Sequence, residues 1–247
     1  MDRALYIAMT GAKHNMMAQT NHSNNLANVN THGFRADFAQ ARSMPIYHGD
    51  GHPTRAYALT ENPATDFTPG TLEETGSDLD IAIKGDGFLA VQSPDGTEAY
   101  VRTASLSIDA EGVVHAGRHP VLGNGGPIII PPSQSIDIGT DGTISIIPAG
   151  DVAANLVQVD RLRFVNPDVN QLDKFEDGLV RLRDGEEADP DLNVRMVSGF
   201  LETSNVNMMS EFTDILSLSR QYEIQVKMMK TVEENNQSSA RLLQMQG

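Results

Sequence analysis

Three kinds of short motif in this sequence contain the residue types that metal binding, phosphate binding or acid–base catalysis requires. The segment His48-Gly49-Asp50-Gly51-His52 places two imidazoles and a carboxylate within five residues, and both groups are zinc ligands. A metal site also needs converging ligands with hydrogen-bonding support around them, which a glycine-rich loop does not supply by itself. We therefore interpret the segment as a flexible loop and predict no metal site.

The other motifs also fall short of a catalytic arrangement. Gly123-Asn124-Gly125-Gly126 resembles a phosphate-binding loop, but it lacks the Lys-Ser/Thr ending and leads into a predicted strand, so we interpret it as a turn. The carboxylate pairs are Asp80 with Asp86 and Glu73 with Glu74, and no nucleophile or histidine stands beside either pair. The sequence has no Gly-x-Ser-x-Gly or His-Glu-x-x-His motif. We predict that the protein is not an enzyme and uses no cofactor.

Composition excludes further classes of function. The 247 residues carry a formal net charge of −15, and binding nucleic-acid phosphates needs clustered Lys and Arg, so no nucleic-acid partner is predicted. The absence of cysteine excludes disulfides, thiol catalysis and Cys-type zinc sites. No stretch approaches 18 apolar residues, so no membrane insertion is predicted. A cleavable signal peptide is not expected, because Lys13 and His14 interrupt the N-terminal segment.

The two ends of the chain are predicted to be long helices. Ser204 to Met245 contains no Gly or Pro, and its apolar residues recur every three and four positions, as in a helical seam. At 1.5 Å per residue this helix would span roughly 60 Å, so its apolar stripe needs another long helix. The first 28 residues supply one, weakened slightly by Gly11. Both stripes are narrow, so we expect the helices to be marginal in a lone monomer.

We predict that the two helices pair as a coiled coil, which copies or relatives of the protein complete. The predicted contact residues are Leu5, Met9, Ala12, Met16, Leu26, Phe212, Ile215, Tyr222, Val226, Met229 and Leu243. The polar residues Ser219, Glu233 and Asn236 fall in the same seam, where they either fix its register or face water as the seam drifts.

Between the helices the sequence predicts an extended arm and a β domain. Prolines and glycines interrupt residues 35–78 without a long periodic run, so we expect an arm that orders on assembly. From residue 79 to 198, short β-rich runs alternate with turn signals such as Asp141-Gly142. The expected fold class is α+β, with an inserted antiparallel all-β domain. The predicted segments are 1–34 (helix and junction), 35–78 (arm), 79–198 (β domain) and 199–247 (long helix).

Motifs spread over nearly the whole chain resemble, in order, those of the bacterial flagellar rod and hook protein family. At the start they are Met1-Asp2-Arg3-Ala4-Leu5-Tyr6 and Ser23-Asn24-Asn25-Leu26-Ala27-Asn28. In the middle lies Leu79-Asp80-Ile81-Ala82-Ile83-Lys84-Gly85-Asp86-Gly87-Phe88. At the end lie Gly199-Phe200-Leu201-Glu202-Thr203-Ser204-Asn205-Val206-Asn207 and Arg220-Gln221-Tyr222-Glu223. The start and the length look most like the proximal-rod members, with the distal-rod members next. His32 departs from the family, which usually has Pro there.

The resemblance implies a structural subunit of the flagellar basal-body rod, which crosses the periplasm, transmits torque and forms part of the export channel. Relatives place their terminal helices in the inner tube and the β domain outside. They are exported unfolded by the flagellar type III apparatus without signal cleavage. The implied partners are therefore copies of the protein, other rod proteins and the export apparatus. Two alternatives from other classes are a secreted enzyme acting on cell-wall polymer and a glycan-binding module that oligomerises through its helices.

Overall fold

The computed structural model describes residues 3–38, 41–46, 55–60, 64–149, 155–175 and 177–244. The chain divides into two compact units, each built from segments that are distant in the sequence. The helical unit comprises Met1–Val29, Ala36–Asp66 and Val206–Gly247. The β unit comprises Asn30–Arg35 and Phe67–Asn205. The chain therefore passes from one unit to the other several times.

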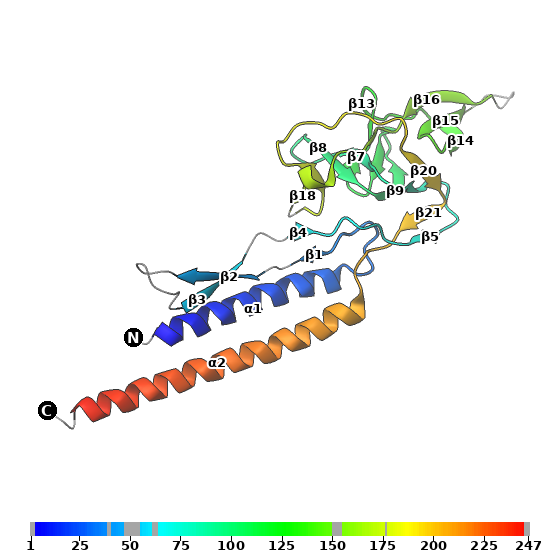
Figure 1. Cartoon of the computed structure of the whole chain (residues 1–247). Helices are drawn as coiled ribbons and strands as arrows, with labels where there is room; N and C mark the ends of the chain where they lie inside the picture. Colours follow the sequence, from blue (N-terminus) through cyan, green and yellow to red (C-terminus); the bar gives the residue numbers. More distant parts are fainter. Residues whose placement is uncertain are drawn as a thin grey trace. The chain divides into compact units, whose positions relative to one another are not determined.

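Two long helices dominate the helical unit (Figure 1). Helix α1 spans Arg3–Ala27 and helix α2 spans Met208–Gln244, so the predicted terminal helices are confirmed. Asn207 caps α2, because its side-chain oxygen accepts hydrogen bonds from the backbone nitrogens of Met209 (3.0 Å) and Ser210 (3.2 Å). These bonds satisfy two of the donors that every helix start leaves free.

The helical unit also contains four short strands. Strand β1 (Asp37–Phe38) pairs with β4 (Ala64–Thr65), and β2 (Ala41–Ile46) pairs with β3 (Arg55–Thr60), both antiparallel. The imidazole Nε2 of His14 lies 2.6 Å from the carbonyl oxygen of Ala58, which joins α1 to β3. The segment expected to be an irregular arm thus has regular pairing in its described residues. Its boundaries at 35 and 78 stay a prediction.

The β unit holds the remaining strands and one short 3₁₀ helix. The strands are β5 (Leu72–Glu74), β6 (Asp80–Lys84), β7 (Phe88–Gln92), β8 (Glu98–Val101), β9 (Thr103–Ile108), β10 (Val114–Ala116), β11 (His119–Pro120), β12 (Leu122–Gly123), β13 (Gly126–Pro127), β14 (Ser133–Ile138), β15 (Thr143–Pro148), β16 (Val157–Arg161), β17 (Phe164–Val165), β18 (Leu172–Lys174), β19 (Val180–Leu182), β20 (Arg195–Ser198) and β21 (Phe200–Glu202). The 3₁₀ helix is Val169–Gln171.

These strands form two five-stranded sheets and several smaller ones, and each described strand pair is antiparallel, as predicted. The larger sheets have the orders β11-β10-β9-β6-β20 and β17-β7-β8-β19-β18. Strands β14, β15 and β16 form a separate three-stranded sheet. The predicted Asp141-Gly142 turn joins β14 to β15, and Gly142 takes the left-handed conformation there (φ +84°).

The core of the β unit lies on both faces of strand β7. Successive side chains of a strand point to opposite faces, so Leu89 and Val91 join one buried cluster while Phe88 and Ala90 join another. The larger cluster is almost entirely aliphatic, and Phe164 is its one aromatic member among the buried described residues. Such a strand has no water-facing side, which explains why its sequence is a continuous apolar run.

Candidate functional site

Helices α1 and α2 lie side by side and run in opposite directions (Figure 1). At one end of the pair, His22 Nδ1 lies 2.6 Å from Glu211 Oε2, and Asn25 Nδ2 donates to Glu211 Oε1 at 3.3 Å. Further along, a Cβ atom on Gly11 would come within 3.2 Å of the Gln225 side chain. The missing side chain at Gly11 therefore lets the two helices approach closely.

The least exposed positions mark the surface that each helix buries within its own chain. On α2 they are Glu211, Ile215, Leu218, Ser219, Gln225, Met229 and Val232. On α1 the buried and half-buried positions include Ala4, Ala8, Gly11, Asn15, Ala18, His22 and Asn25, which also recur at steps of four and three. We call these two series the inner seam. Its α1 side consists of small and polar residues.

The predicted contact residues lie partly in this seam and partly beside it. Ala12 is buried, and the half-buried members are Leu5, Leu26, Ile215 and Met229. The exposed members, with their exposed fractions, are Met9 (51%), Met16 (62%), Phe212 (51%), Tyr222 (40%) and Val226 (41%). Leu243 belongs to α2, but its side chain lies outside the described set. Their role as an interface between subunits remains a prediction.

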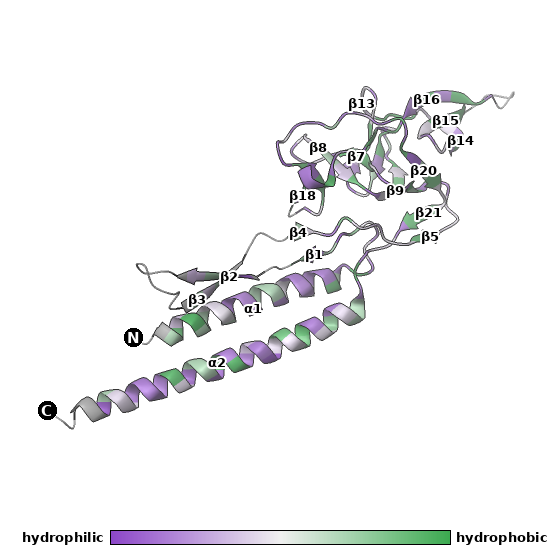
Figure 2. Ribbon diagram, in the orientation of Figure 1, coloured by the Kyte–Doolittle hydropathy of each residue, from purple (hydrophilic) through white to green (hydrophobic). Residues whose placement is uncertain are grey.

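Large apolar side chains also lie exposed elsewhere on α2. They are Met208, Met209, Leu216, Ile224 and Met228. Figure 2 shows apolar and hydrophilic residues alternating along both helices. Contiguous exposed apolar surface is rare on monomeric soluble proteins and marks contact sites. The polar residues of the predicted seam differ in burial, since Ser219 is half-buried while Glu233 and Asn236 are exposed.

A buried ionic cluster in the β unit joins segments from three parts of the chain. Glu202 Oε1 pairs with the Arg35 guanidinium and accepts a hydrogen bond from Gly70 N at 2.9 Å. Glu202 Oε2 accepts from Arg102 Nε at 3.1 Å, and Arg102 Nη1 donates to the carbonyl of Gly87 at 2.6 Å. The exposed fractions of Glu202, Arg35 and Arg102 are 1%, 3% and 7%. Burial lowers the pKa of Arg102, and the neighbouring Glu202 carboxylate opposes that shift.

Backbone contacts around the same cluster anchor residues 33–35 and 202. Gly33 N donates to the carbonyl of Glu202 at 2.8 Å, and Lys174 Nζ donates to the carbonyl of Arg35 at 2.8 Å. Gly33 adopts φ +72°, and a Cβ atom there would lie 2.9 Å from a methyl carbon of Thr103. In the sequence, Arg35 follows α1 and Glu202 precedes α2. The sequence analysis named Glu202 only as part of a motif. A single carboxylate that follows Phe200-Leu201 in a β-rich run was the signal that could have identified it as a buried charge.

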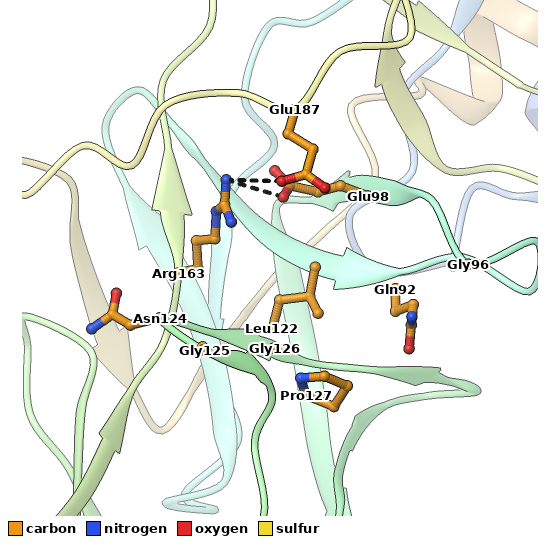
Figure 3. Close-up of a pocket in the computed structure, with 11 residues that line it drawn as sticks. Gln92, Gly96, Glu98, Leu122, Asn124, Gly125, Gly126, Pro127, Arg163 and Glu187 are labelled. Carbon is orange, nitrogen blue, oxygen red and sulfur yellow. Dashed lines mark ion pairs between the residues drawn. The ribbon is translucent and has the colours of Figure 1, made fainter.

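The glycine-rich loop also belongs to a site that the sequence did not predict. Residues 123–126 form the turn of the β12–β13 hairpin, so their interpretation as a turn is confirmed. They line a pocket of about 360 Å³ together with Glu98, Arg163 and Glu187 (Figure 3). Arg163 Nη2 lies 3.2 Å from Glu98 Oε2 and 3.6 Å from Glu187 Oε2. Burial raises the pKa of Glu98, and the positive charge of Arg163 opposes the shift.

The carboxylate pair in this pocket does not have the arrangement that a glycoside hydrolase needs. A hydrolytic acid must reach the glycosidic oxygen, with the second carboxylate across the scissile bond. Here the guanidinium of Arg163 lies between the two carboxylates and bridges Glu98 to Glu187, so no scissile bond can lie between them. The two pairs named from the sequence are not combined into such a site: Glu73, Glu74 and Asp86 are exposed, while Asp80 is buried in β6.

Other candidate chemistry is not supported in the described part of the chain. The segment His48–His52 lies outside the described residues. Within the ranges that are described, no three His, Asp or Glu side chains come together as a possible metal site. None of the described helices combines the length and apolar character that crossing a membrane requires.

Comparisons with known proteins agree with the motif resemblance. Residues 82–146 match the flagellar hook protein FlgE/F/G D1 domain, and residues 197–242 match the flagellar basal body rod FlgEFG protein C-terminal family. The chain is 37% identical to the flagellar basal-body rod protein FlgF of Escherichia coli K12, over 99% of this chain and all of the relative. It is 30% identical to FlgF of Caulobacter vibrioides over 98% of both chains. It is 33% identical to FlgG of Bacillus subtilis, over 95% of this chain and 96% of that protein.

Proposed function

Since this chain belongs to the family of flagellar basal-body rod proteins and is a structural subunit of that rod, we propose that it assembles through its two terminal helices. The family places it in the flagellar basal body. Its relatives are structural rod proteins. The sequence of this chain contains no catalytic motif of the kinds considered above.

The exposed stripe beside the inner seam carries this proposal. Met9, Met16, Phe212, Tyr222 and Val226 are exposed apolar residues on helices that already pack together through other positions. Such a helix pair can receive helices of neighbouring subunits on its second apolar surface, in a coiled-coil arrangement. Contacts between different surfaces of identical subunits do not close into a dimer, and they generate an open helical array where the rotation between subunits does not close a ring. The half-buried residues Leu5, Leu26, Ile215 and Met229, with Ala12 and Leu243, would complete these contacts.

We further propose a place in the proximal rod, beside copies of the chain and other rod proteins. FlgF relatives align with the whole chain, and the match to Escherichia coli FlgF is closer than that to Bacillus subtilis FlgG. A distal position remains the alternative. Export by the flagellar type III apparatus, without signal cleavage, is part of the same proposal. The assembled helices would line the export channel and transmit torque.

The decisive variants are Phe212→Asp and Val226→Asp. Each places a charge on the exposed stripe. In the wild type, burial of the apolar side chain on assembly would contribute roughly 1.5–3 kcal/mol per side chain. We expect both variants to abolish rod incorporation and swimming while the β unit still folds. The measurements are motility in soft agar, basal-body composition and thermal unfolding of the purified chain. Gln221→Asp is the matched control, because Gln221 is an exposed polar residue of the same helix. Normal swimming speed with Phe212→Asp would contradict the proposal.

A further inference from the structure

We propose that the pocket of the β unit binds the side chain of a lysine from a partner protein. The pocket opens beside the β12–β13 turn and is lined by Glu98, Arg163 and Glu187 (Figure 3). Its volume of about 360 Å³ is ample for one long side chain. The binding chemistry is a primary ammonium at the end of an aliphatic stem.

The pocket contains a buried carboxylate that lacks hydrogen bonds. The Glu98 side chain is 2% exposed, and neither of its oxygens has a partner with hydrogen-bond geometry among the described residues. Burial raises the pKa of Glu98, and the nearby Tyr100 hydroxyl and Ala188 backbone amide only partly oppose that rise. Arg163 supplies a positive charge 3.2 Å away, but its Nη2 donates a hydrogen bond to the carbonyl of Ala188 at 3.0 Å. Buried polar groups in native proteins are almost always hydrogen-bonded, so an unsatisfied one needs an explanation. An incoming ammonium has three donors to offer.

The sign of the surrounding charge also favours a cation. Two carboxyl groups, Glu98 and Glu187, face one guanidinium, so the pocket holds more acidic than basic groups. Glu187 is 68% exposed and lies in the acidic segment Asp184-Gly185-Glu186-Glu187-Ala188-Asp189. At the neighbouring turn, hydrogen bonds from Thr97 lower the pKa of Asp95 to about 2, so this carboxylate is ionised at neutral pH. A field of this sign attracts cations and repels phosphates.

The walls of the pocket suit an aliphatic stem. Leu122 and Pro127 line the pocket on the side away from the carboxylates (Figure 3). A lysine buries its methylene stem against apolar surface while its ammonium reaches a polar partner. A Cβ atom on Gly125 or Gly126 would meet no other atom within 4 Å, so these two residues leave the mouth open. Apolar wall and carboxylates together suit lysine better than a small inorganic cation.

The identity of the partner as another rod subunit rests on the proposed function, whereas the binding of a lysine side chain does not. The two can fail separately. The helix variants Phe212→Asp and Val226→Asp test assembly, and they leave the pocket unchanged. A small-molecule probe tests the pocket, and its result does not depend on whether the helices assemble.

The probe is N-acetyl-lysine methylamide, titrated into the full-length chain and followed by NMR chemical shifts. Its matched control is N-acetyl-norleucine methylamide, which keeps the stem and lacks the ammonium. We expect saturable shifts at residues 92, 122–127 and 187 with a dissociation constant of about 1 mM, and no saturation with the norleucine compound. Raising the salt from 0.05 to 0.5 M should weaken binding several-fold, because screening reduces attraction between charges.

Two variants separate binding from folding. Glu187→Gln keeps the size of the exposed side chain and removes one carboxylate, so it should weaken probe binding about tenfold. Glu98→Gln removes the buried carboxylate and should weaken probe binding to a similar extent. Glu111→Gln, an exposed carboxylate in another turn, should leave binding unchanged. Unchanged amide shifts away from the pocket would show that the variants fold. Absence of saturable binding to the wild-type chain would overturn the proposal, as would equal binding by the norleucine compound or by folded Glu187→Gln.

Discussion

At the scale of single residues, Glu202 connects segments of the β unit that are far apart in the sequence. Its carboxylate meets Arg35 and Arg102, and its backbone carbonyl accepts from Gly33 N. The sequence separations from Glu202 to Arg35 and to Arg102 are 167 and 100 residues. A buried carboxylate with this many partners fixes a geometry more than it adds net stability, because removing charges from water is costly.

Replacing Glu202 tests this interpretation. Glu202→Gln leaves two buried guanidinium groups without a compensating charge, so we expect the free energy of unfolding of the β unit to fall by about 3–5 kcal/mol. Urea unfolding measures the loss. Glu187→Gln is the control: it removes an ion pair whose carboxylate is 68% exposed and should cost under about 1 kcal/mol. Equal effects from the two variants would show that the buried cluster is not critical.

Two glycines in matching Asp-Gly-Thr turns provide a second test. Gly142 (φ +84°) and Gly96 (φ +86°) share the left-handed conformation. A Cβ atom on Gly142 would lie 2.5 Å from the Phe164 ring, whereas one on Gly96 would have no neighbour within 4 Å. We expect Gly142→Ala to lower the free energy of unfolding by about 3 kcal/mol, from strain and overpacking, and Gly96→Ala by about 1 kcal/mol. Thermal unfolding of both variants checks this; a similar loss for both would exclude the packing contribution.

At the scale of elements, the surface through which each helix packs within the chain differs in part from the surface that its apolar periodicity predicts. The inner seam uses Glu211, Leu218 and Gln225, whereas the predicted seam includes the exposed residues Phe212 and Val226, each one position further along. Ile215, Ser219 and Met229 belong to both. One residue is a rotation of about 100° around a helix. A helix can therefore present one surface to its own chain and an adjacent apolar surface to another subunit.

Enlarging a residue of the inner seam should separate the helices without altering the exposed stripe. Ala8 is 1% exposed, so Ala8→Leu overpacks the seam and should destabilise the helical unit by about 1–3 kcal/mol. Met9→Leu, one position further along, changes an exposed side chain and should stay within about 0.5 kcal/mol of the wild type. The helical signal in circular dichroism, followed through a thermal melt, measures both. An unaffected melt in Ala8→Leu would show that the seam is not packed in solution.

At the scale of the whole molecule, the β unit is completed by residues at the predicted junction between the N-terminal helix and the arm. Asn30–Arg35 belongs to the β unit although Phe67–Asn205 makes up the rest. Lys174 Nζ lies 3.8 Å from the centre of the Phe34 ring, a cation–π contact that adds to the Arg35 pairing. A β domain cut at residue 79, the predicted boundary, would lose all of these contacts as well as strand β5.

Excised fragments test how much the N-terminal segment contributes. We expect the fragment 30–205 to unfold at a clearly higher urea concentration than 67–205, because it retains Arg35 beside Glu202. Introducing Arg35→Ala into fragment 30–205 should lower its free energy of unfolding by about 3 kcal/mol. This loss should remove most of the difference in stability between the two fragments. If the two fragments have the same stability, residues 30–35 do not belong to the folded β unit.

The sequence by itself determined the classes of element and their order. Helical periodicity without Gly or Pro identified α2, and alternating short β runs with turn signals identified the antiparallel β unit, because both signals are local. Motifs such as Gly199–Asn207 also identified the family, and the comparisons agree. The same local signals did not give the bounds of the individual strands, and the strand predicted to follow the turn at residues 123–126 is only the two-residue β13 (Gly126–Pro127).

Only the tertiary structure decided which residues meet. The apolar pattern selected the largest side chains as the helix contact, but close approach of two helices favours small residues such as Ala8 and Gly11. The Glu202 cluster and the Glu98 pocket join residues that are far apart in the sequence, and nothing in local spacing predicts such pairs. Apolar periodicity shows that a helix has a surface to bury. Which partner buries it depends on the packing of the whole chain and of its neighbours.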